Sequence, residues 1–211
     1  MTDSIAHLNF EQCSLRLQTL LARSTRTLLG IIGPPGAGKS TLALRLRDLH
    51  PAQSQIVPMD GFHLAQVELE RLGRAARKGA PDTFDSLGYV SLLQRLRHQA
   101  SDEIVYAPDF RREIEEPVAG AIPIFASARL LIAEGNYLTL EQGSWSQVKP
   151  LLDEIWYIDV DPALRRERLV ARHVQFGRSR QAAIDWVQST DEPNARLIEA
   201  SRHRADALVS L

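Results

Sequence analysis

One short segment, residues 33–40, constrains this chain more than any other stretch. It reads GPPGAGKS and matches the pattern G-x-x-x-x-G-K-[ST] in full, with an apolar run before it and a helix-like segment after it. The glycines let the backbone turn tightly so that successive N–H groups point inward, and the positive end of the following helix faces the same place. The segment therefore predicts a strand, a loop and a helix that together hold the phosphates of a nucleotide.

Three side chains in this segment have expected roles. Lys39 can reach the β- and γ-phosphates, the Ser40 hydroxyl is placed to ligate Mg²⁺, and Thr41 can help to hold the phosphates. By itself the pattern indicates a nucleotide and not a reaction. The residues expected to contact the nucleotide here are Gly33, Pro34, Pro35, Gly36, Ala37, Gly38, Lys39, Ser40 and Thr41.

Strand-like and helix-like segments alternate along the 211 residues. The alternation predicts an α/β fold of the P-loop NTPase type, with three layers, a mainly parallel central sheet and a single domain over 1–211. Residues 64–86 are expected to form a helix and an irregular excursion, and 104–107 and 122–125 short extended segments. Strands are predicted at 27–32, 55–59, 129–133, 154–160 and 205–211, and helices at 10–22, 39–49, 89–98, 163–174, 179–188 and 193–202.

Two carboxylates follow predicted strands, and such strand ends lie along one edge of a parallel sheet. Asp60 can accept the proton of an acceptor hydroxyl as that oxygen meets the γ-phosphorus, and Glu134 can order the magnesium ion. His63 is a candidate for lining the acceptor pocket. The alternatives are an Asp-Gly turn for Asp60, a loop or capping carboxylate for Glu134, and an ordinary hydrogen-bonded histidine for His63.

Arginines gather in one predicted helix. Residues 165, 168 and 172 fall near one stripe, and Gly177 follows, so the stretch from about 165 to 190 resembles a lid that closes over phosphates and excludes water. A second basic cluster at residues 71–78 lies beside Asp82 and Asp85 and could contact an acceptor. For both clusters the alternative is a solvated basic face.

Composition limits the remaining function classes. The formal net charge is −1, so bulk charge does not suggest nucleic acid or an anionic membrane as a partner. Cys13 is the single cysteine and cannot form an intrachain disulfide. Without a signal-like start or an apolar run of roughly 20 residues, we expect a cytoplasmic protein. The oligomeric state stays open, with a homodimer as the candidate assembly.

Several segments together resemble the uridine kinase/phosphoribulokinase/pantothenate kinase branch of P-loop kinases, and more narrowly the bacterial fructose-transport-system and nucleoside/nucleotide kinase-like proteins. The pairing of PMDGFH with EGNYL is more specific than the phosphate loop. One departure is the triplet Phe110-Arg111-Arg112, where the family pattern has F-D-R. The matching segments are 33–41, 58–65 (PMDGFHLA), 77–85 (RKGAPDTFD), 108–120, 134–138 (EGNYL), 168–177 (RLVARHVQFG) and 191–198 (DEPNARLI).

The resemblance implies roles for residues in these segments. Asp60 would be the catalytic base and Glu134 would serve the metal. The lid residues on the nucleotide would be Arg168, Arg172 and Arg178, with Asn194 near the adenine. The residues expected to border the acceptor are Phe62, His63, Arg77, Asp85, Arg112 and Asn136.

The motifs favour an ATP- and Mg²⁺-dependent kinase that phosphorylates a hydroxyl of a small molecule, such as a sugar, a nucleoside or a pantothenate-like metabolite. Asp60, Lys39 and Arg172 are expected to carry the chemistry. The alternative is a regulatory NTPase switch, because residues 85–88 (DSLG) fit the D-x-x-G pattern of GTPases. That tetrapeptide does not follow a predicted buried strand, and the sequence has no N-K-x-D guanine signature, so the kinase hypothesis is preferred.

Overall fold

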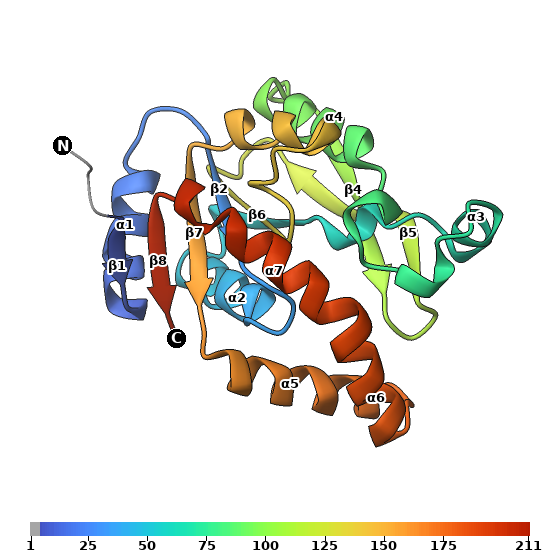
Figure 1. The fold of residues 1–211 in the computed structure, drawn as a ribbon. Helices are drawn as coiled ribbons and strands as arrows, with labels where there is room; N and C mark the ends of the chain where they lie inside the picture. The colour runs from blue at the N-terminus through green and yellow to red at the C-terminus, as the bar shows by residue number, and fades with distance from the viewer. Residues whose placement is uncertain (1–4) are drawn as a thin grey trace.

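A six-stranded parallel sheet forms the centre of the computed structural model, which describes residues 5–211 (Figure 1). The strand β2 that precedes the phosphate loop lies inside the sheet, between β7 and β6. The order across the sheet is β1 (Ala6–Leu8), β8 (Ala207–Ser210), β7 (Glu154–Asp159), β2 (Thr27–Ile32), β6 (Leu130–Gly135) and β3 (Ser54–Pro58). The expected mainly parallel α/β sheet is confirmed, and β1 is an addition that the sequence pattern missed because three residues carry no periodicity.

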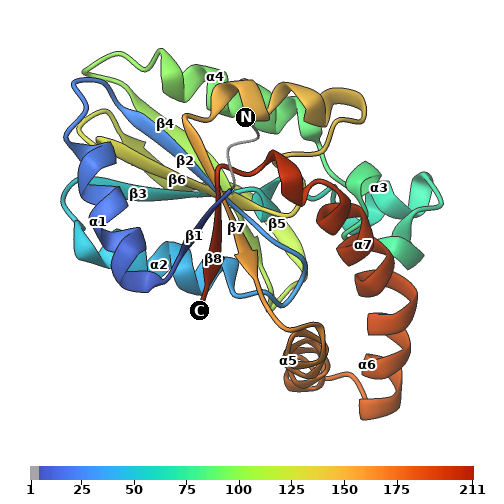
Figure 2. The same ribbon diagram turned by 60° about the vertical axis from the view of Figure 1, so that its left-hand side comes forward.

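Helices cover both faces of the sheet, which confirms the three layers (Figure 2). The helices α1 (Phe10–Leu21) and α2 (Lys39–Leu49) pack on one face, while α4 (Ser86–Arg97) and the short helix at Gly143–Gln147 pack on the other. Strand β2 shows why its sequence is uniformly apolar. Its odd-numbered residues Leu29 and Ile31 enter the first layer, and Leu28 and Ile32 enter the second.

A two-stranded antiparallel hairpin, β4 (Ile104–Arg111) with β5 (Glu116–Phe125), stands beside the edge strand β3. The side chain of Gln55 on β3 joins the two, since its Nε2 donates to Pro123 O at 2.8 Å and its Oε1 accepts from Phe125 N at 2.7 Å. The sequence predicted only the start of β4 (104–107) and the end of β5 (122–125), which pair with each other. The central residues of the hairpin are half-buried or exposed and none is buried, so they lack the alternation that marks a strand with one buried face.

The chain leaves the sheet in two other places. Between β3 and α4 it forms α3 (Gln66–Arg71) and short 3-10 turns, as the expected helix and excursion. After β7 it forms α5 (Pro162–Gln175) and then a continuous run of α6 (Arg180–Trp186), a π turn (Val187–Asp191) and α7 (Glu192–Ala200). The two helices predicted at 179–188 and 193–202 are thus joined, because Pro193 falls in the first turn of α7, where its missing N–H is tolerated. Within residues 5–211, no helix has the length and apolar character needed to cross a membrane.

Strand register and one glycine position the candidate site. Ile31 of β2 pairs with Glu134 of β6, and Glu134 pairs with Pro58 of β3, so the loops after these strands meet at one edge. Gly61 follows Asp60 in a 3-10 turn, and a Cβ built at Gly61 would lie 2.2 Å from the carbonyl oxygen of Pro108 on β4. Only glycine lets the hairpin approach this turn so closely.

We expect Arg26→Ala to destabilise the fold by about 2–4 kcal/mol, because one half-buried guanidinium ties the end of α4 to the end of β5. Urea unfolding checks this value, with the exposed Arg23→Ala as a control that should cost less than about 0.5 kcal/mol. Equal losses in the two variants would contradict the prediction. The acceptors of Arg26 are Leu96 O (3.0 Å), Gln99 Oε1 (2.5 Å), Phe125 O (3.0 Å), Ala126 O (2.7 Å) and Ala128 O (2.8 Å).

Candidate active site

The phosphate loop adopts the expected strand–loop–helix form. Gly36 and Gly38 have φ angles of +80° and +97°, which side chains rarely adopt, and Gly38 is the N-cap of α2. The Lys39 ammonium lies against the loop and donates to the carbonyl oxygens of Gly33 (2.9 Å) and Pro34 (3.2 Å). The loop backbone therefore already holds the lysine beside the site where its charge is needed.

Helix α5 packs directly on this loop through Arg165. This side chain is only 4% exposed, donates to Pro35 O at 3.4 Å and forms an ion pair with Glu192 at the start of α7. The helical spacing predicts that Arg165 belongs to the phosphate-binding stripe of the lid. The structure corrects that grouping, since the burial of Arg165 makes it an anchor between the loop, α5 and α7.

Glu134 and Ser40 form a polar pair beside the loop. The Ser40 hydroxyl donates to Glu134 Oε2 at 3.3 Å, and Glu134 is 7% exposed. Burial, and next the charge of Asp60, raise the pKa of Glu134 to about 7, while Lys39 opposes the rise. For Lys39, burial lowers the pKa to about 8 against the opposing pull of Glu134 and Asp60. The carboxylates of Glu134 and Asp60 and the ammonium of Lys39 thus lie close enough for their charges to shift one another's pKa values.

Asp60 opens the 3-10 turn after β3, and its carboxylate faces the tip of the hairpin. Arg112, at the start of the hairpin turn, places Nη2 3.3 Å from Asp60 Oδ2. Burial, and next the like charge of Arg112, lower the pKa of the Arg172 guanidinium on α5. Asp60 therefore lies among cations contributed by the loop, the hairpin and the lid.

His63 stands on the wall beyond Asp60, between two aromatic rings. Its ring centroid is 4.0 Å from that of Phe84 and 4.6 Å from that of Phe110, and its Nδ1 contacts Asp60 O at 2.7 Å. A carbonyl oxygen only accepts hydrogen bonds, so Nδ1 carries the proton. Burial lowers the pKa of His63, so the neutral ring offers Nε2 as an acceptor.

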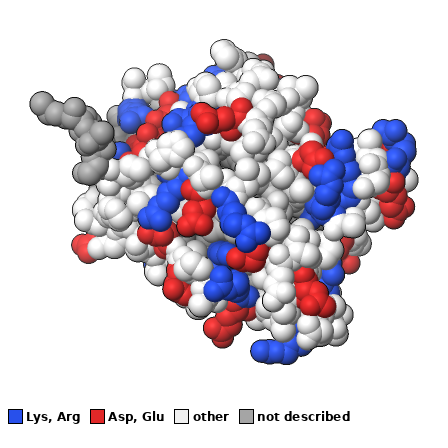
Figure 3. All heavy atoms as spheres, viewed as in Figure 1, with Lys and Arg blue, Asp and Glu red and all other residues white. Residues whose placement is uncertain are grey.

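One cleft of about 1090 Å³ collects most of the residues that the sequence singled out. It runs from the lid across the phosphate loop to the hairpin, and basic and acidic side chains alternate on the face of the molecule drawn in Figure 3. The predicted residues that line it are Pro35, Gly36, Gly38, Lys39, Ser40, Thr41, Asp60, His63, Arg112, Glu134, Asn136, Arg168, Arg172, Arg178 and Asn194.

Three residues expected at the acceptor do not line this cleft. Phe62 packs into the core, with its ring edge-on to Tyr89 at 5.2 Å, and Arg77 forms an ion pair with Asp82. Asp85 caps α4 by accepting from Gly88 N at 2.8 Å, which also accounts for the D-x-x-G tetrapeptide. The geometry gives these three side chains structural roles in place of the predicted contact.

Asn194, which the resemblance placed near the adenine, lines the cleft beside Gly79. Its Nδ2 donates to Gly79 O at 3.4 Å, and the Tyr137 hydroxyl donates to the same oxygen at 2.5 Å. Asn194 thus links α7 to the excursion that also carries Lys78. Sequence reasoning missed the wall residues Phe84 and Phe110, although both stand inside segments that matched the family pattern.

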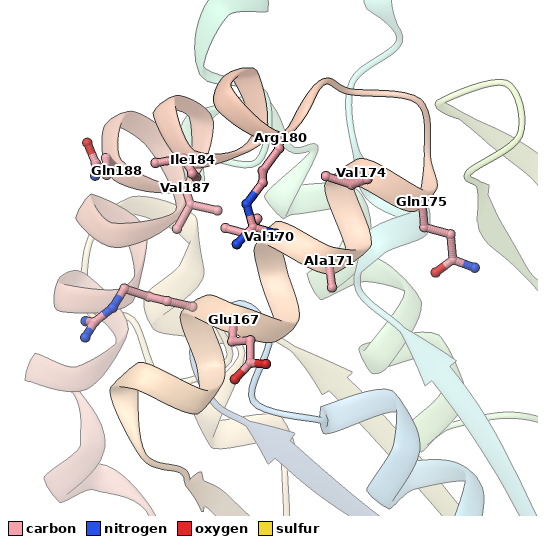
Figure 4. A pocket seen from close by; sticks show the side chains of 10 residues that line it. Glu167, Val170, Ala171, Val174, Gln175, Arg180, Ile184, Val187 and Gln188 are labelled. Atoms are coloured by element: carbon pink, nitrogen blue, oxygen red, sulfur yellow. The ribbon is translucent and has the colours of Figure 1, made fainter.

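Two further cavities lie beside the cleft and along the lid. A groove of about 660 Å³ runs along β3 and reaches Asp60 and Glu134 from the side of α2. A third space of about 700 Å³ lies between α5 and α6, where three valines, an isoleucine and an alanine meet five polar or charged side chains (Figure 4). Its lining includes none of the cleft residues, so this part of the lid faces away from the phosphate loop.

Known proteins resemble the whole chain. A Schizosaccharomyces pombe protein named "Putative uridine kinase C227.14" is 33% identical over 212 residues, which cover 95% of this chain and 90% of that protein. An Aspergillus versicolor protein, "ATP-dependent kinase-like protein notR'", is 40% identical over 152 residues, or 68% of this chain and 88% of that protein. The chain belongs to the uridine kinase-like P-loop kinases. No protein-family model matches it.

The fold of this kinase agrees with a solved structure. The crystal structure of a "putative fructose transport system kinase" from Silicibacter sp. TM1040 shares 37% of its sequence, with a TM-score of 0.83 over 94% of this chain and 98% of that one. The resemblance that the motifs indicated is thus confirmed, and the chain is a phosphotransferase.

The departure from the family triplet lies outside the cleft of this kinase. Arg111, which replaces the acidic residue, is exposed and pairs with Asp109 of its own strand at 3.1 Å. Arg112, the residue that matches the pattern, is the one that reaches Asp60. Arg111 is the last residue of β4 and Arg112 the first of the turn, and only Arg112 lines the cleft.

We expect Glu134→Gln to stabilise the nucleotide-free kinase at alkaline pH. The folded-state pKa of about 7 exceeds the ordinary value of 4.5, so the folded protein holds this proton more tightly than the unfolded chain. Stability from this group is complete below about pH 4.5 and is lost as pH rises through 7. The variant should exceed the wild type by on the order of 1–3 kcal/mol at pH 8 and by much less at pH 5.

Urea unfolding without nucleotide or metal at both pH values measures this difference. Glu113→Gln is the matched control, because Glu113 is exposed in the hairpin turn and has no ion pair within residues 5–211. A stability gap for Glu134→Gln that does not change between pH 5 and pH 8 would contradict the prediction.

Proposed function

We propose that this kinase transfers the γ-phosphoryl group of ATP, with Mg²⁺, to a hydroxyl of a small polar metabolite. The observation that carries the proposal is the shared cleft, in which the Lys39 ammonium, the Ser40–Glu134 pair and the Asp60 carboxylate lie together beneath the lid arginines. The relatives support it by their printed names, which describe one as ATP-dependent and others as kinases of uridine or of a fructose transport system.

The residues present fit magnesium. Ser40 and Glu134 offer one hydroxyl and one carboxylate oxygen, which suits an ion that keeps several waters and binds phosphate oxygens. Within residues 5–211 there is no cluster of three or more carboxylate, histidine or cysteine side chains that would enclose a metal by itself. The ion would shield the phosphates when bound, and its positive charge would favour the ionised form of Glu134.

Asp60 is the general base in this proposal. It takes the proton of the acceptor hydroxyl while that oxygen bonds to the γ-phosphorus and the bond from phosphorus to the β,γ-bridging oxygen breaks, leaving ADP. Asp60 stands at the end of β3, two strands from the phosphate loop, so an acceptor bound beside it would face the triphosphate held by the loop. Such a reaction depends mainly on positioning and charge, because little covalent chemistry falls to the protein.

The lid supplies the remaining charge. Arg168 and Arg172 on α5 and Arg178 after it line the cleft, and Arg178 stacks on Trp186 at 4.1 Å. Their guanidinium groups would neutralise the charge that spreads over the phosphoryl oxygens and would keep water from the reacting atoms. Because Arg165 fastens α5 to the loop itself, these groups are held at a set height above the phosphates.

Sugars, nucleosides and pantothenate-like alcohols are the candidate acceptors. The wall formed by Phe84, His63 and Phe110 presents aromatic faces and one hydrogen-bond acceptor, which suit a polyhydroxyl ring or a base. The alternative of a regulatory GTPase switch receives no support from the relatives, and Asp85 in its D-x-x-G tetrapeptide serves as a helix cap.

We expect Asp60→Asn to bind ATP within about twofold of the wild type while phosphoryl transfer falls by about 10²–10⁴-fold, because the amide cannot take the proton. The measurement is ATP consumption in a screen of sugars, nucleosides and pantothenate, combined with nucleotide binding. Asp102→Asn is the control, since Asp102 is an exposed turn residue outside the cleft and should leave both quantities unchanged. Turnover close to wild type in Asp60→Asn would refute the assignment of the base.

A further inference from the structure

One arginine of the lid is held by an aromatic ring and not by a carboxylate. Arg178 lies in the turn between α5 and α6, and its guanidinium carbon is 4.1 Å from the centroid of the Trp186 ring. Within residues 5–211, the Arg178 side chain forms no ion pair and no hydrogen bond. Arg165 and Arg166, by contrast, both reach the carboxylate of Glu192. The tryptophan ring is therefore the contact that places the Arg178 guanidinium.

Trp186 is itself held in place by two other elements of the lid. It is the last residue of α6 and lines the cleft together with Arg178. The ring of His173 on α5 packs edge-on against the Trp186 ring, with the two centroids 6.5 Å apart. His173 Nε2 donates in turn to the carboxylate of Asp191, which ends the π turn and is only 8% exposed. The tryptophan is thus supported from α5 and from the π turn.

A stacked guanidinium keeps its hydrogen-bond donors free. It contacts the ring through its flat face, while its five N–H donors point outward in its own plane. A carboxylate partner would occupy some of those donors and would have to be displaced before a phosphate could bind. The Trp186 ring holds the cation without competing for its donors, so the N–H groups of Arg178 stay available for phosphate oxygens.

The turn that carries Arg178 gives a reason for such support. Residues 176–179 are exposed, and Gly177 has a φ angle of +96°. An arginine on an exposed turn loses rotamer freedom when it binds a phosphate, and this loss weakens binding. A ring that already holds the side chain in the cleft removes part of that loss before the nucleotide arrives.

We propose that Trp186 is a positioning residue for nucleotide binding, which holds the Arg178 guanidinium in the cleft with its N–H donors free for the phosphates of ATP. The inference rests on the proposed use of ATP. It adds a residue that belongs neither to the phosphate loop nor to the lid arginines. Trp186 acts through Arg178 alone, so its effect on nucleotide binding depends on the presence of that arginine.

The next arginine along the chain provides a matched control. Arg180 lies two residues after Arg178 and stands over the groove between α5 and α6, outside the cleft (Figure 4). Arg180→Gln therefore removes the same charge from the same part of the lid without touching the stack. Within residues 5–211, Trp186 is in neither apolar layer of the sheet, so Trp186→Leu should fold, and urea unfolding verifies this. Trp186→Phe keeps a smaller aromatic face for the cation.

The test measures by calorimetry the dissociation constant of a non-hydrolysable ATP analogue with Mg²⁺. We expect Trp186→Leu to raise this constant about three- to tenfold, while Trp186→Phe and Arg180→Gln stay within about twofold of the wild type. Arg178→Gln should raise it about tenfold or more, because a charge-assisted contact is lost. In the Arg178→Gln background, Trp186→Leu should change the constant by less than about twofold, since the ring then has no cation to hold.

Three results would overturn the inference: Trp186→Leu that binds the analogue as tightly as the wild type, Trp186→Phe that binds as weakly as Trp186→Leu, or a loss that persists undiminished in the Arg178→Gln background. The last result would mean that the ring supports the lid as a whole. Failure of the wild type to bind the analogue would remove the proposed use of ATP together with this inference. Wild-type binding with unchanged Trp186 variants would leave the kinase proposal standing alone.

Discussion

Parallel pairing of β2 with β6 and of β6 with β3 is the constraint on which the candidate site depends. The register places Ile31, Glu134 and Pro58 side by side, so that the phosphate loop, Glu134 and the Asp60 turn lie at one edge of the sheet. Two apolar layers hold this register, because a shift of one residue would turn every buried side chain of β2 to the wrong face. The relative positions of the side chains at the candidate site therefore depend on core packing several residues away from them.

The charges at this edge are unbalanced in the protein alone. Burial raises the pKa of Glu134 to about 7 and lowers that of Lys39 to about 8, which means that burial destabilises the charged form of each side chain. In the proposed function, magnesium would bring a positive charge to Glu134, the triphosphate would bring negative charge to Lys39, and the lid arginines would meet the outer phosphate oxygens.

Much of the site followed from the sequence because its residues lie next to local signals. The glycines and Lys39 of the loop, and Asp60 and Glu134 at the ends of apolar runs, needed only a strand and a turn to be placed. The errors came where a side chain has two roles available. Arg165 lies in the arginine stripe but turns into the interface with Pro35 and Glu192, which spacing does not encode. Asp85 caps its own helix, and this local signal competes with a role at the acceptor.

The sequence by itself determined the phosphate loop, the alternating strands and helices, and the kinase family, since these depend on short-range backbone demands and on apolar periodicity. Only the tertiary structure decided which charges meet. The hairpin approaches Asp60 because Gly61 leaves room for the Pro108 carbonyl, and this contact between residues far apart in the chain brings Arg112 to the Asp60 carboxylate. Such pairings arise from the packing of one element on another, and no local pattern of residues specifies them.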